Sequence, residues 1–335
     1  MQTTKYLIVG AGMTGDMAAK GIREHDPEGS ITLIGADPHP PYKRPLLTKG
    51  LWQGAPEEKL WREPAEGAEL VTGRRIVSLD LAAHTATSDA GEEYGWEKLL
   101  LATGARPREI PGAEGVVWFR TLDDYRRVRA IAGEGAHVAV IGGGFIGSEI
   151  AAALVGNGAR VTMLFPEPGI GFRLFPTDLS ASVTDYYREK GVEVLTGAMV
   201  ASASGNRVET QAGETIEADA VVAGLGVIPD TELAEAAGLE VNDGIVVDEY
   251  GRVPGHDDVF AAGDVARFPV PALGTSLRIE HEDHANSHGH AVGANMAGAD
   301  TPYEHLPFFY SDLFDLGYEA VGLVDSRLEA AENWQ

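Results

Sequence analysis

Short apolar runs alternate with amphipathic stretches along this chain, and this alternation is typical of an α/β protein. Residues 6–9 and 137–141 are apolar and strand-like, and glycines lead from them into the predicted helices 17–22 and 149–155. Residues 31–35 predict the strand that completes the first βαβ unit, and the second unit runs to about residue 165. Strands that alternate with helices favour parallel sheets covered by helices.

Turn residues and further short apolar runs fill the segments around these two units. They predict β-hairpins over residues 70–100 and 192–222. Residues 259–261 predict another buried strand, and residues 280–296 predict a polar helix rich in histidine. The fold class is therefore α/β: two Rossmann-like, three-layer nucleotide-binding domains, one inserted in the other, followed by a short C-terminal α+β segment.

Two glycine-rich turns, each between a predicted strand and a predicted helix, are the sharpest local signals. The first fingerprint is Gly-Ala-Gly-Met-Thr-Gly at residues 10–15, and the second is Gly-Gly-Gly-Phe-Ile-Gly at residues 142–147. In this context the glycines permit a tight turn, close approach of a pyrophosphate and close packing of helix on strand. The helix N-terminus adds free N–H groups and partial positive charge.

Two fingerprints predict two dinucleotides, and the economical pair is FAD with NAD(P)H. The residues expected to contact them are Gly10, Gly12, Met13, Thr14 and Gly15 in the first fingerprint and Gly142, Gly144, Phe145, Ile146 and Gly147 in the second. We expect an FAD-binding domain of residues 1–111 and 246–305 and an NAD(H)-binding domain of residues 112–245. Residues 306–335 predict only the start of a C-terminal domain, and their small number indicates that this domain is truncated.

Composition narrows the class of protein. The chain has 335 residues and no run of 18 apolar ones, so we expect no membrane span. Its N-terminus enters a strand without room for a signal peptide, so we expect a cytoplasmic location. The absence of cysteine excludes a redox-active dithiol, a disulfide and a cysteine-ligated iron–sulfur cluster. A formal net charge of −25 disfavours nucleic acid and acidic lipid as partners and suits solubility, including in a high-salt cytoplasm.

Residues 41–49, Pro-Tyr-Lys-Arg-Pro-Leu-Leu-Thr-Lys, resemble a segment of the FAD-dependent pyridine-nucleotide oxidoreductases. More narrowly, they are similar to the group of apoptosis-inducing factor and the oxygenase-coupled ferredoxin reductases. The resemblance extends over nearly the whole chain, through residues 102–104, 145–149, 164–167, 263–264, 279–284 and 311–325. Residues 317–325 are especially similar to the apoptosis-inducing-factor branch.

The resemblance assigns a joint catalytic role to Lys49 and Glu149. It implies that the lysine lies near flavin N5 and that the glutamate holds it. A buried lysine is costly unless it is paired, and a cation beside the flavin favours negative charge on the ring. Without the resemblance, these residues would be two unrelated surface charges.

The resemblance also implies several FAD contacts. Arg44 and Arg120 match arginines at the FAD phosphates or the flavin ring, or else are ordinary surface arginines. Asp264, after Gly263, matches an aspartate that hydrogen-bonds the ribityl chain, a role compatible with capping the next helix. Asp37 is expected at the adenosine ribose, although Ala36 holds the usual place of the acid. The remaining expected contacts are Ile76, Thr103, Gly104, His281 and Tyr310.

In the second domain, the strand ends at Phe165, and Glu167 follows two positions later. A carboxylate near the ribose repels a 2′-phosphate and favours NADH over NADPH, whereas Arg173 softens the preference. The alternative for Glu167 is a plain loop acid. Phe145 is expected to stack on the nicotinamide, with a core helix residue as the alternative. The resemblance adds Gly226 and Glu319 as nucleotide contacts.

Four histidines fall in the predicted helix 280–296: His281, His284, His288 and His290. They invite comparison with a metal site, but such a site needs convergent ligands with supporting partners. A polar helix that crosses the flavin edge explains them more simply, with His281 as a catalytic neighbour of the nicotinamide or flavin. We therefore expect no metal.

The resemblance implies an FAD-dependent NADH:acceptor oxidoreductase. Hydride passes from NADH to flavin N5, and electrons then pass to a ferredoxin-like protein, a quinone or oxygen. The alternative is a redox-responsive protein like apoptosis-inducing factor, which acts through assembly or partner binding. A nucleotide-binding scaffold without redox chemistry is a third option, which Lys49 and Glu149 argue against. A homodimer is compatible with the resemblance.

Overall fold

The computed structural model describes residues 2–329 and 331, so residues 330 and 332–335, the end of the predicted C-terminal segment, lie outside it. The chain forms two compact units. The first unit comprises Met1–Lys43, Glu58–Arg106 and Pro229–Phe309. The second unit comprises Arg44–Glu57, Pro107–Ile228 and Tyr310–Gln335, and its long middle segment interrupts the first unit in the sequence.

The first unit is built on a seven-stranded sheet in the order β3-β2-β1-β6-β5-β4, with β18 also paired to β6. Its parallel strands are β1 (Gln2–Val9), β2 (Ile31–Gly35), β3 (Glu69–Thr72), β6 (Glu93–Leu101) and β18 (Val259–Ala261). Two antiparallel strands, β4 (Ile76–Asp80) and β5 (Thr85–Ser88), extend it beyond β6. The hairpin prediction is therefore wrong for β3, because this strand pairs in parallel with β2.

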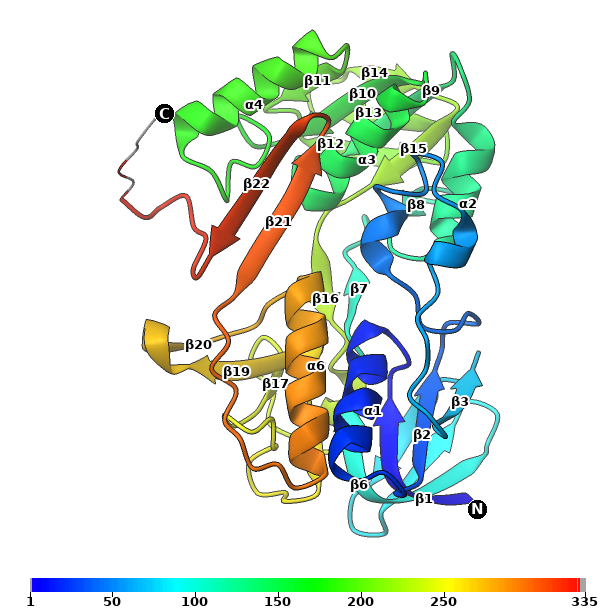
Figure 1. Cartoon of the computed structure of the whole chain (residues 1–335). Coiled ribbons are helices and arrows are strands. Elements are labelled where there is room, and N and C mark those ends of the chain that lie inside the picture. Colours follow the sequence, from blue (N-terminus) through cyan, green and yellow to red (C-terminus); the bar gives the residue numbers. More distant parts are fainter. Residues whose placement is uncertain (1, 330, 332–335) are drawn as a thin grey trace. The chain divides into compact units, whose positions relative to one another are not determined.

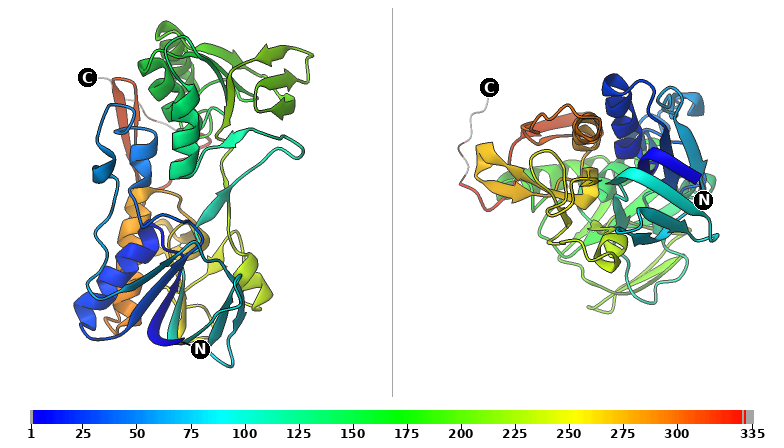
Figure 2. Two further views of the ribbon diagram at one scale, coloured as in Figure 1. Left: turned by 90° about the vertical axis from the view of Figure 1, so that its right-hand side faces the viewer. Right: turned by 90° about the horizontal axis from the view of Figure 1, so that it is seen from below.

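Two helices, α1 (Met13–His25) and α6 (Glu282–Met296), lie side by side on one face of this sheet (Figures 1 and 2). Their backbones approach closely through glycine. A Cβ atom on Gly289 would lie 2.5 Å from the Thr14 carbonyl oxygen, and one on Gly293 would lie 2.1 Å from the Ala18 carbonyl oxygen. Larger side chains at these α6 positions would therefore push the helices apart.

Apolar side chains cover both faces of the first sheet. One cluster joins α1, β1, β2 and α6, and a second cluster lies under the smaller elements. These elements are α5 (Glu232–Ala236), a small sheet of β17 (Ile245–Val246), β19 (Ala266–Val270) and β20 (Thr275–Leu277), and the 3-10 turns η3 (Gly263–Val265) and η4 (Pro271–Leu273).

The second unit has a five-stranded, all-parallel sheet in the order β11-β10-β9-β15-β8. The strands are β8 (Val117–Trp118), β9 (His137–Ile141), β10 (Arg160–Phe165), β11 (Glu193–Thr196) and β15 (Ala220–Ala223). Its helices are α2 (Leu122–Ile131), α3 (Phe145–Gly156) and α4 (Thr177–Glu189), with the short turn η1 (Arg44–Leu47). The predicted α/β class with Rossmann-like sheets is thus confirmed.

Only part of the hairpin predicted over residues 192–222 is correct. An antiparallel sheet forms from β12 (Val200–Ser204), β13 (Arg207–Thr210) and β14 (Thr215–Glu217). The flanking β11 and β15 instead join the parallel sheet, because their buried apolar residues find partners in β10 and β9. A short apolar run has no feature that identifies its partner strand.

The remaining strands form two pairs. One is β7 (Ala105–Pro107) with β16 (Val227–Pro229), and the other is the hairpin of β21 (Phe308–Leu313) and β22 (Leu316–Val321). A further 3-10 turn, η2, covers Glu57–Lys59. Within the described part of the chain, every helix is too short or too polar to cross a bilayer.

Candidate functional site

The first fingerprint has the backbone that its glycines predict. Gly10 has a φ of 117°, and a Cβ there would lie 2.1 Å from the Ala102 carbonyl oxygen. A Cβ on Gly15 would lie 2.0 Å from the Gly10 oxygen, so the helix packs tightly on the turn. At Gly12, the N-cap of α1, a Cβ would meet nothing within 4 Å. This open helix N-terminus fits a pyrophosphate.

The second fingerprint repeats this geometry position by position. Gly142 has a φ of 116°, and a Cβ there would lie 2.3 Å from the Gly224 carbonyl oxygen. A Cβ on Gly147 would lie 2.0 Å from the Gly142 oxygen, whereas one on Gly144, the N-cap of α3, would meet nothing within 4 Å. Both helices thus begin directly after the middle glycine, four residues earlier than predicted.

The turn at Gly263 lies against the first fingerprint. Gly263 has a φ of 75°, and a Cβ there would lie 2.2 Å from Thr14 Oγ1. Thr14 and its neighbour Met13 are buried at the start of α1. Asp264 follows in η3, and its carbonyl oxygen accepts a hydrogen bond from Arg278 at 3.2 Å. The fold thus brings Thr14 and Gly263 together.

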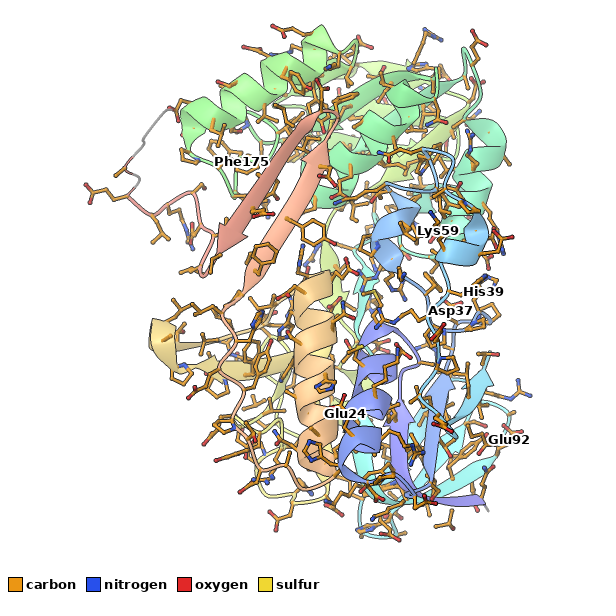
Figure 3. The ribbon with its side chains drawn as sticks, in the orientation of Figure 1. Glu24, Asp37, His39, Lys59, Glu92 and Phe175 are labelled. Atoms are coloured by element: carbon orange, nitrogen blue, oxygen red, sulfur yellow. The ribbon has the colours of Figure 1, made fainter. Side chains whose placement is uncertain are left out.

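Asp37 is fixed in the loop that follows β2, where Figure 3 labels it beside His39. Its carboxylate accepts hydrogen bonds from the His39 backbone N–H at 3.0 Å and from the Tyr42 hydroxyl at 2.9 Å. These two donors hold the carboxylate in one orientation. The shift by one position from the usual acid therefore leaves an ordered carboxylate after β2.

Four other residues predicted to contact FAD have structural partners in the first unit. Thr103 donates a 2.7 Å hydrogen bond to the Asp230 carbonyl oxygen, and Gly104 accepts one from the Asp230 N–H at 3.0 Å. Ile76 is buried in the apolar cluster under the sheet. His281 is the N-cap of α6, where its Nδ1 accepts a 3.3 Å hydrogen bond from the Asp283 N–H.

In the second unit, Lys49 and Glu149 form the predicted ion pair, with Nζ 3.4 Å from Oε1. Both side chains are largely buried, at 15% and 10% exposed. A second carboxylate, Asp312, lies 3.3 Å from the same ammonium group. The ring centroid of Tyr310 lies 4.6 Å from Nζ, close enough for a cation–π contact. Lys49 is therefore held by two carboxylates and one aromatic ring.

Two hydroxyl groups complete the environment of Glu149, and neither was among the site residues predicted from the sequence. Thr48 donates a 2.6 Å hydrogen bond to Oε2, and Ser311 donates a 2.6 Å hydrogen bond to Oε1. Each lies next to a predicted site residue in the sequence, Thr48 before Lys49 and Ser311 after Tyr310. That adjacency was the available signal, but only the fold shows that they converge on Glu149.

Aromatic rings gather at the N-terminus of α3. Phe145 stacks on Tyr318 of β22 at a centroid distance of 6.1 Å, and Phe175 meets Tyr318 edge-on at 5.0 Å. With Ser148, Ser311 and other neighbours, they line a small cavity. The Tyr318 hydroxyl is buried and has no hydrogen-bond partner among the described residues. Burial and then the charge of Glu149 raise the pKa of Tyr318, so the phenol stays protonated.

Glu167 forms an ion pair with Arg173 at 2.8 Å, with side chains 23% and 83% exposed. Glu167 and Arg173, which are predicted to act in opposite directions on a 2′-phosphate, are therefore direct partners.

Arg44, predicted to contact FAD, donates a 2.7 Å hydrogen bond to the Arg120 carbonyl oxygen. Gly226, with a φ of 80°, is exposed, as is Glu319 on β22.

The four histidines of α6 do not converge on a point. His281 caps the helix and His290 pairs with Glu24 of α1 at 3.1 Å (Figure 3 labels Glu24), whereas His284 and His288 are buried. Across residues 2–329 and 331, no three histidine or acidic side chains are grouped so as to hold a metal ion.

Comparison with known proteins supports the same interpretation. Residues 4–289 match the family model described as pyridine nucleotide-disulphide oxidoreductase, and residues 292–334 match the C-terminal model of mitochondrion-associated apoptosis-inducing factor. Mitochondrial apoptosis-inducing factor 1 of Dictyostelium discoideum is 33% identical over 99% of this chain and 70% of its own length. The ferredoxin–NAD(+) reductase component of the anthranilate 1,2-dioxygenase system of Burkholderia cepacia is 37% identical over 96% of this chain and 83% of its own length.

A solved structure is also similar. A chain in the crystal structure of the covalent putidaredoxin reductase–putidaredoxin complex superposes with a TM-score of 0.89 at 32% identity, and the match covers 96% of this chain and 82% of that one. The fingerprints, the two Rossmann-like sheets and these matches lead to one conclusion. The chain belongs to the pyridine nucleotide-disulphide oxidoreductase family and is an oxidoreductase that binds FAD and NAD(H).

Proposed function

We propose that this chain oxidises NADH through FAD and passes the electrons to a ferredoxin-like protein. The observation that carries the proposal is the pair of matching fingerprints, each with an open helix N-terminus at its middle glycine. Two such cradles support two dinucleotides in one chain. Similar proteins include two named as NAD(+) reductases of ferredoxin or rubredoxin.

The first unit would hold FAD through the first fingerprint, the Asp37 carboxylate and the Gly263 turn. The second unit would hold NADH through the second fingerprint, with Phe145 at the nicotinamide and Glu167 at the ribose. The proposed FAD-binding domain comprises residues 1–111 and 246–305, and the proposed NAD(H)-binding domain comprises residues 112–245. Residues 306–335 belong to a short C-terminal domain. When bound, FAD supplies the redox chemistry, because it accepts a hydride from NADH and releases electrons to a second acceptor.

Lys49 contributes a fixed positive charge. Its ammonium group is restrained by Glu149, Asp312 and the ring of Tyr310. It therefore needs little reorganisation to stabilise negative charge that develops on a nearby group. Thr48 and Ser311 fix the Glu149 carboxylate in turn. The proposal also assigns His281, the N-cap of α6, as a neighbour of the bound nicotinamide or flavin, and Arg44 and Arg120 as contacts of FAD.

The chain has no cysteine, so its own residues provide no dithiol to receive electrons. Electrons must then leave FAD directly for an external acceptor. The similar solved structure of a putidaredoxin reductase–putidaredoxin complex supports a ferredoxin-like protein over a quinone or oxygen as the acceptor.

An anaerobic NADH titration, followed by absorbance from about 300 to 800 nm, tests this proposal, with NADPH in parallel. We expect about one equivalent of NADH to bleach an oxidised flavin spectrum, faster than NADPH does. Addition of oxidised ferredoxin should then restore the flavin spectrum. A protein that binds no flavin, or whose flavin neither nucleotide reduces, would rule the proposal out.

The match of residues 292–334 to the C-terminal model of apoptosis-inducing factor favours a second candidate. In this alternative, NADH reduces FAD slowly and the reduced protein changes its assembly or its partner, including formation of a homodimer. Gel filtration with and without NADH separates the two. Slow turnover with every acceptor, together with an NADH-dependent change in size, would favour the second candidate, and rapid reduction of a ferredoxin would exclude it.

A further inference from the structure

Helix α6 carries two histidines that the proposed function does not use. His284 and His288 are each only 1% exposed, and their rings lie 4.7 Å apart. Phe268 and Tyr303 enclose them, with ring centroids 4.7 to 5.9 Å from one or both histidines. Polar rings in such a site need a hydrogen-bonding reason to be there.

His288 has such a partner in the Gly263 turn. Its Nδ1 lies 3.3 Å from the Gly263 backbone nitrogen and accepts that N–H. An accepting Nδ1 carries no proton, so the neutral ring carries its proton on Nε2. Within the described residues, the buried Nε2 has no partner. The contact that orients this ring is therefore the one to Gly263.

The same turn of α6 also contacts the first fingerprint. Gly289, the residue after His288, lies so close to Thr14 that a Cβ on it would be 2.5 Å from the Thr14 carbonyl oxygen. Gly263 approaches Thr14 from another side, where a Cβ on Gly263 would lie 2.2 Å from Oγ1. One turn of α6 therefore contacts both the first fingerprint and the Gly263 turn.

We propose that His288 is a positioning residue for FAD, which holds the Gly263–Asp264 turn against the first fingerprint by accepting the Gly263 N–H in its neutral form. This inference rests on the proposed function, since it takes the first fingerprint as the FAD site. In this proposal His288 acts through its contact with the turn and not by contact with the cofactor. The same hydrogen bond makes FAD binding sensitive to pH, because a ring protonated on Nδ1 cannot accept the Gly263 N–H.

The surroundings of His288 agree with a neutral ring. Burial, and then the neighbouring His284, hold the pKa of His288 well below its usual value. The titratable groups that face the pair are Tyr303, which contacts both rings, and His281 and His305, whose charges disfavour a proton on His284. The Gly263 peptide acts on both histidines, and Phe268 adds no charge. If the turn opens without FAD, His288 regains its ordinary pKa and binds a proton, which opposes FAD binding at acid pH.

The test measures the dissociation constant of FAD for the whole chain by quenching of flavin fluorescence, between about pH 8 and pH 5. The variants are His288→Asn, whose Oδ1 replaces the accepting Nδ1, and His288→Leu, which removes the acceptor. His290→Asn, at a partly exposed position of the same helix, is the matched control. For the wild type we expect the constant to rise about fivefold between pH 6.5 and 5.5.

His288→Leu should weaken FAD binding at least tenfold at pH 7.5, whereas His288→Asn should stay within about threefold of wild type. His288→Asn should also lose most of the acid-side change, and His290→Asn should keep it. Equal FAD affinity in His288→Leu, or an unchanged pH profile in His288→Asn, would overturn the inference. If His288→Leu fails to fold, the pH profile of His288→Asn still decides. Absence of FAD binding by the wild type would instead overturn the proposed function.

Discussion

Ser311 donates a 2.6 Å hydrogen bond to the carboxylate of Glu149, from 162 positions later in the chain. Both residues are buried, and the bond joins β21 to the helix of the second fingerprint. Glu149 is therefore oriented before any ligand arrives. The first prediction follows from this bond.

Ser311→Ala should lower the stability of the protein by about 1–2 kcal/mol, because one oxygen of a buried carboxylate loses its hydroxyl donor. It should lower the melting temperature by a few degrees. Ser182→Ala is the matched control, since the Ser182 hydroxyl bonds the Asp178 carbonyl oxygen on the exposed side of α4. Equal melting temperatures for Ser311→Ala and wild type would show that the bond contributes little.

Lys49→Met should slow flavin reduction by NADH by about 10- to 100-fold, because it removes a fixed positive charge and leaves two carboxylates without their partner. Anaerobic stopped-flow absorbance measures the rate. Lys190→Met, which removes a lysine paired with Asp315 in the same unit, should leave the rate unchanged. If Lys49→Met retained both the wild-type rate and the wild-type FAD affinity, the role assigned to Lys49 would be wrong.

Glu167→Gln should raise kcat/KM for NADPH relative to NADH by about 5- to 50-fold, since it removes a carboxylate and frees Arg173 for a 2′-phosphate. The ratio is obtained from steady-state kinetics with a common artificial acceptor. Arg173→Gln should change the ratio in the opposite direction. Similar ratios in all three proteins would mean that this ion pair lies away from the bound ribose.

Tyr318→Phe should leave the ligand-free protein as stable as wild type or more stable by up to about 1 kcal/mol, because the deleted hydroxyl is buried without a partner among the described residues. If that hydroxyl binds the nicotinamide amide, the variant should also show a raised KM for NADH with little change in kcat. Melting temperature and steady-state kinetics report the two effects separately. A clear loss of stability would reveal a partner for the hydroxyl in solution.

Stability should fall on the acid side of neutrality. Burial lowers the pKa of His284 to about 3 in the folded protein, against about 6.5 in the unfolded chain. Between these values the unfolded chain binds a proton that the folded protein excludes. The stabilising effect is thus complete above pH 6.5 and is lost as pH falls toward 3, by up to about 1.4 kcal/mol per pH unit.

Melting temperatures of the FAD-free protein between about pH 7.5 and 5 check this prediction. His284→Phe should make the profile shallower, whereas His305→Gln, at an exposed histidine paired with Asp283, should leave most of the slope. A wild-type profile that is flat down to pH 5 would contradict the assignment.

Features that depend on residues close together in the chain could be predicted from the sequence. The glycines of both fingerprints prescribe a backbone in which Gly10 and Gly142 take positive φ, so the strand–turn–helix units and the two dinucleotides could be predicted. The family, the α/β fold and the two cofactors are confirmed by the comparisons. The roles assigned to individual site residues, and the domain boundaries, stay predictions.

Contacts between residues far apart in the chain could not be predicted, because they depend on how the elements pack in three dimensions. The pattern of β3, β11 and β15 predicted strands but gave the wrong partners, because hydrogen bonds between strands form with any suitable edge. It also did not indicate that Thr48, Ser311 and Asp312 converge around the Lys49–Glu149 pair. Likewise, the polar composition of α6 gave no sign that His284 and His288 are buried, because burial depends on what packs against a helix face.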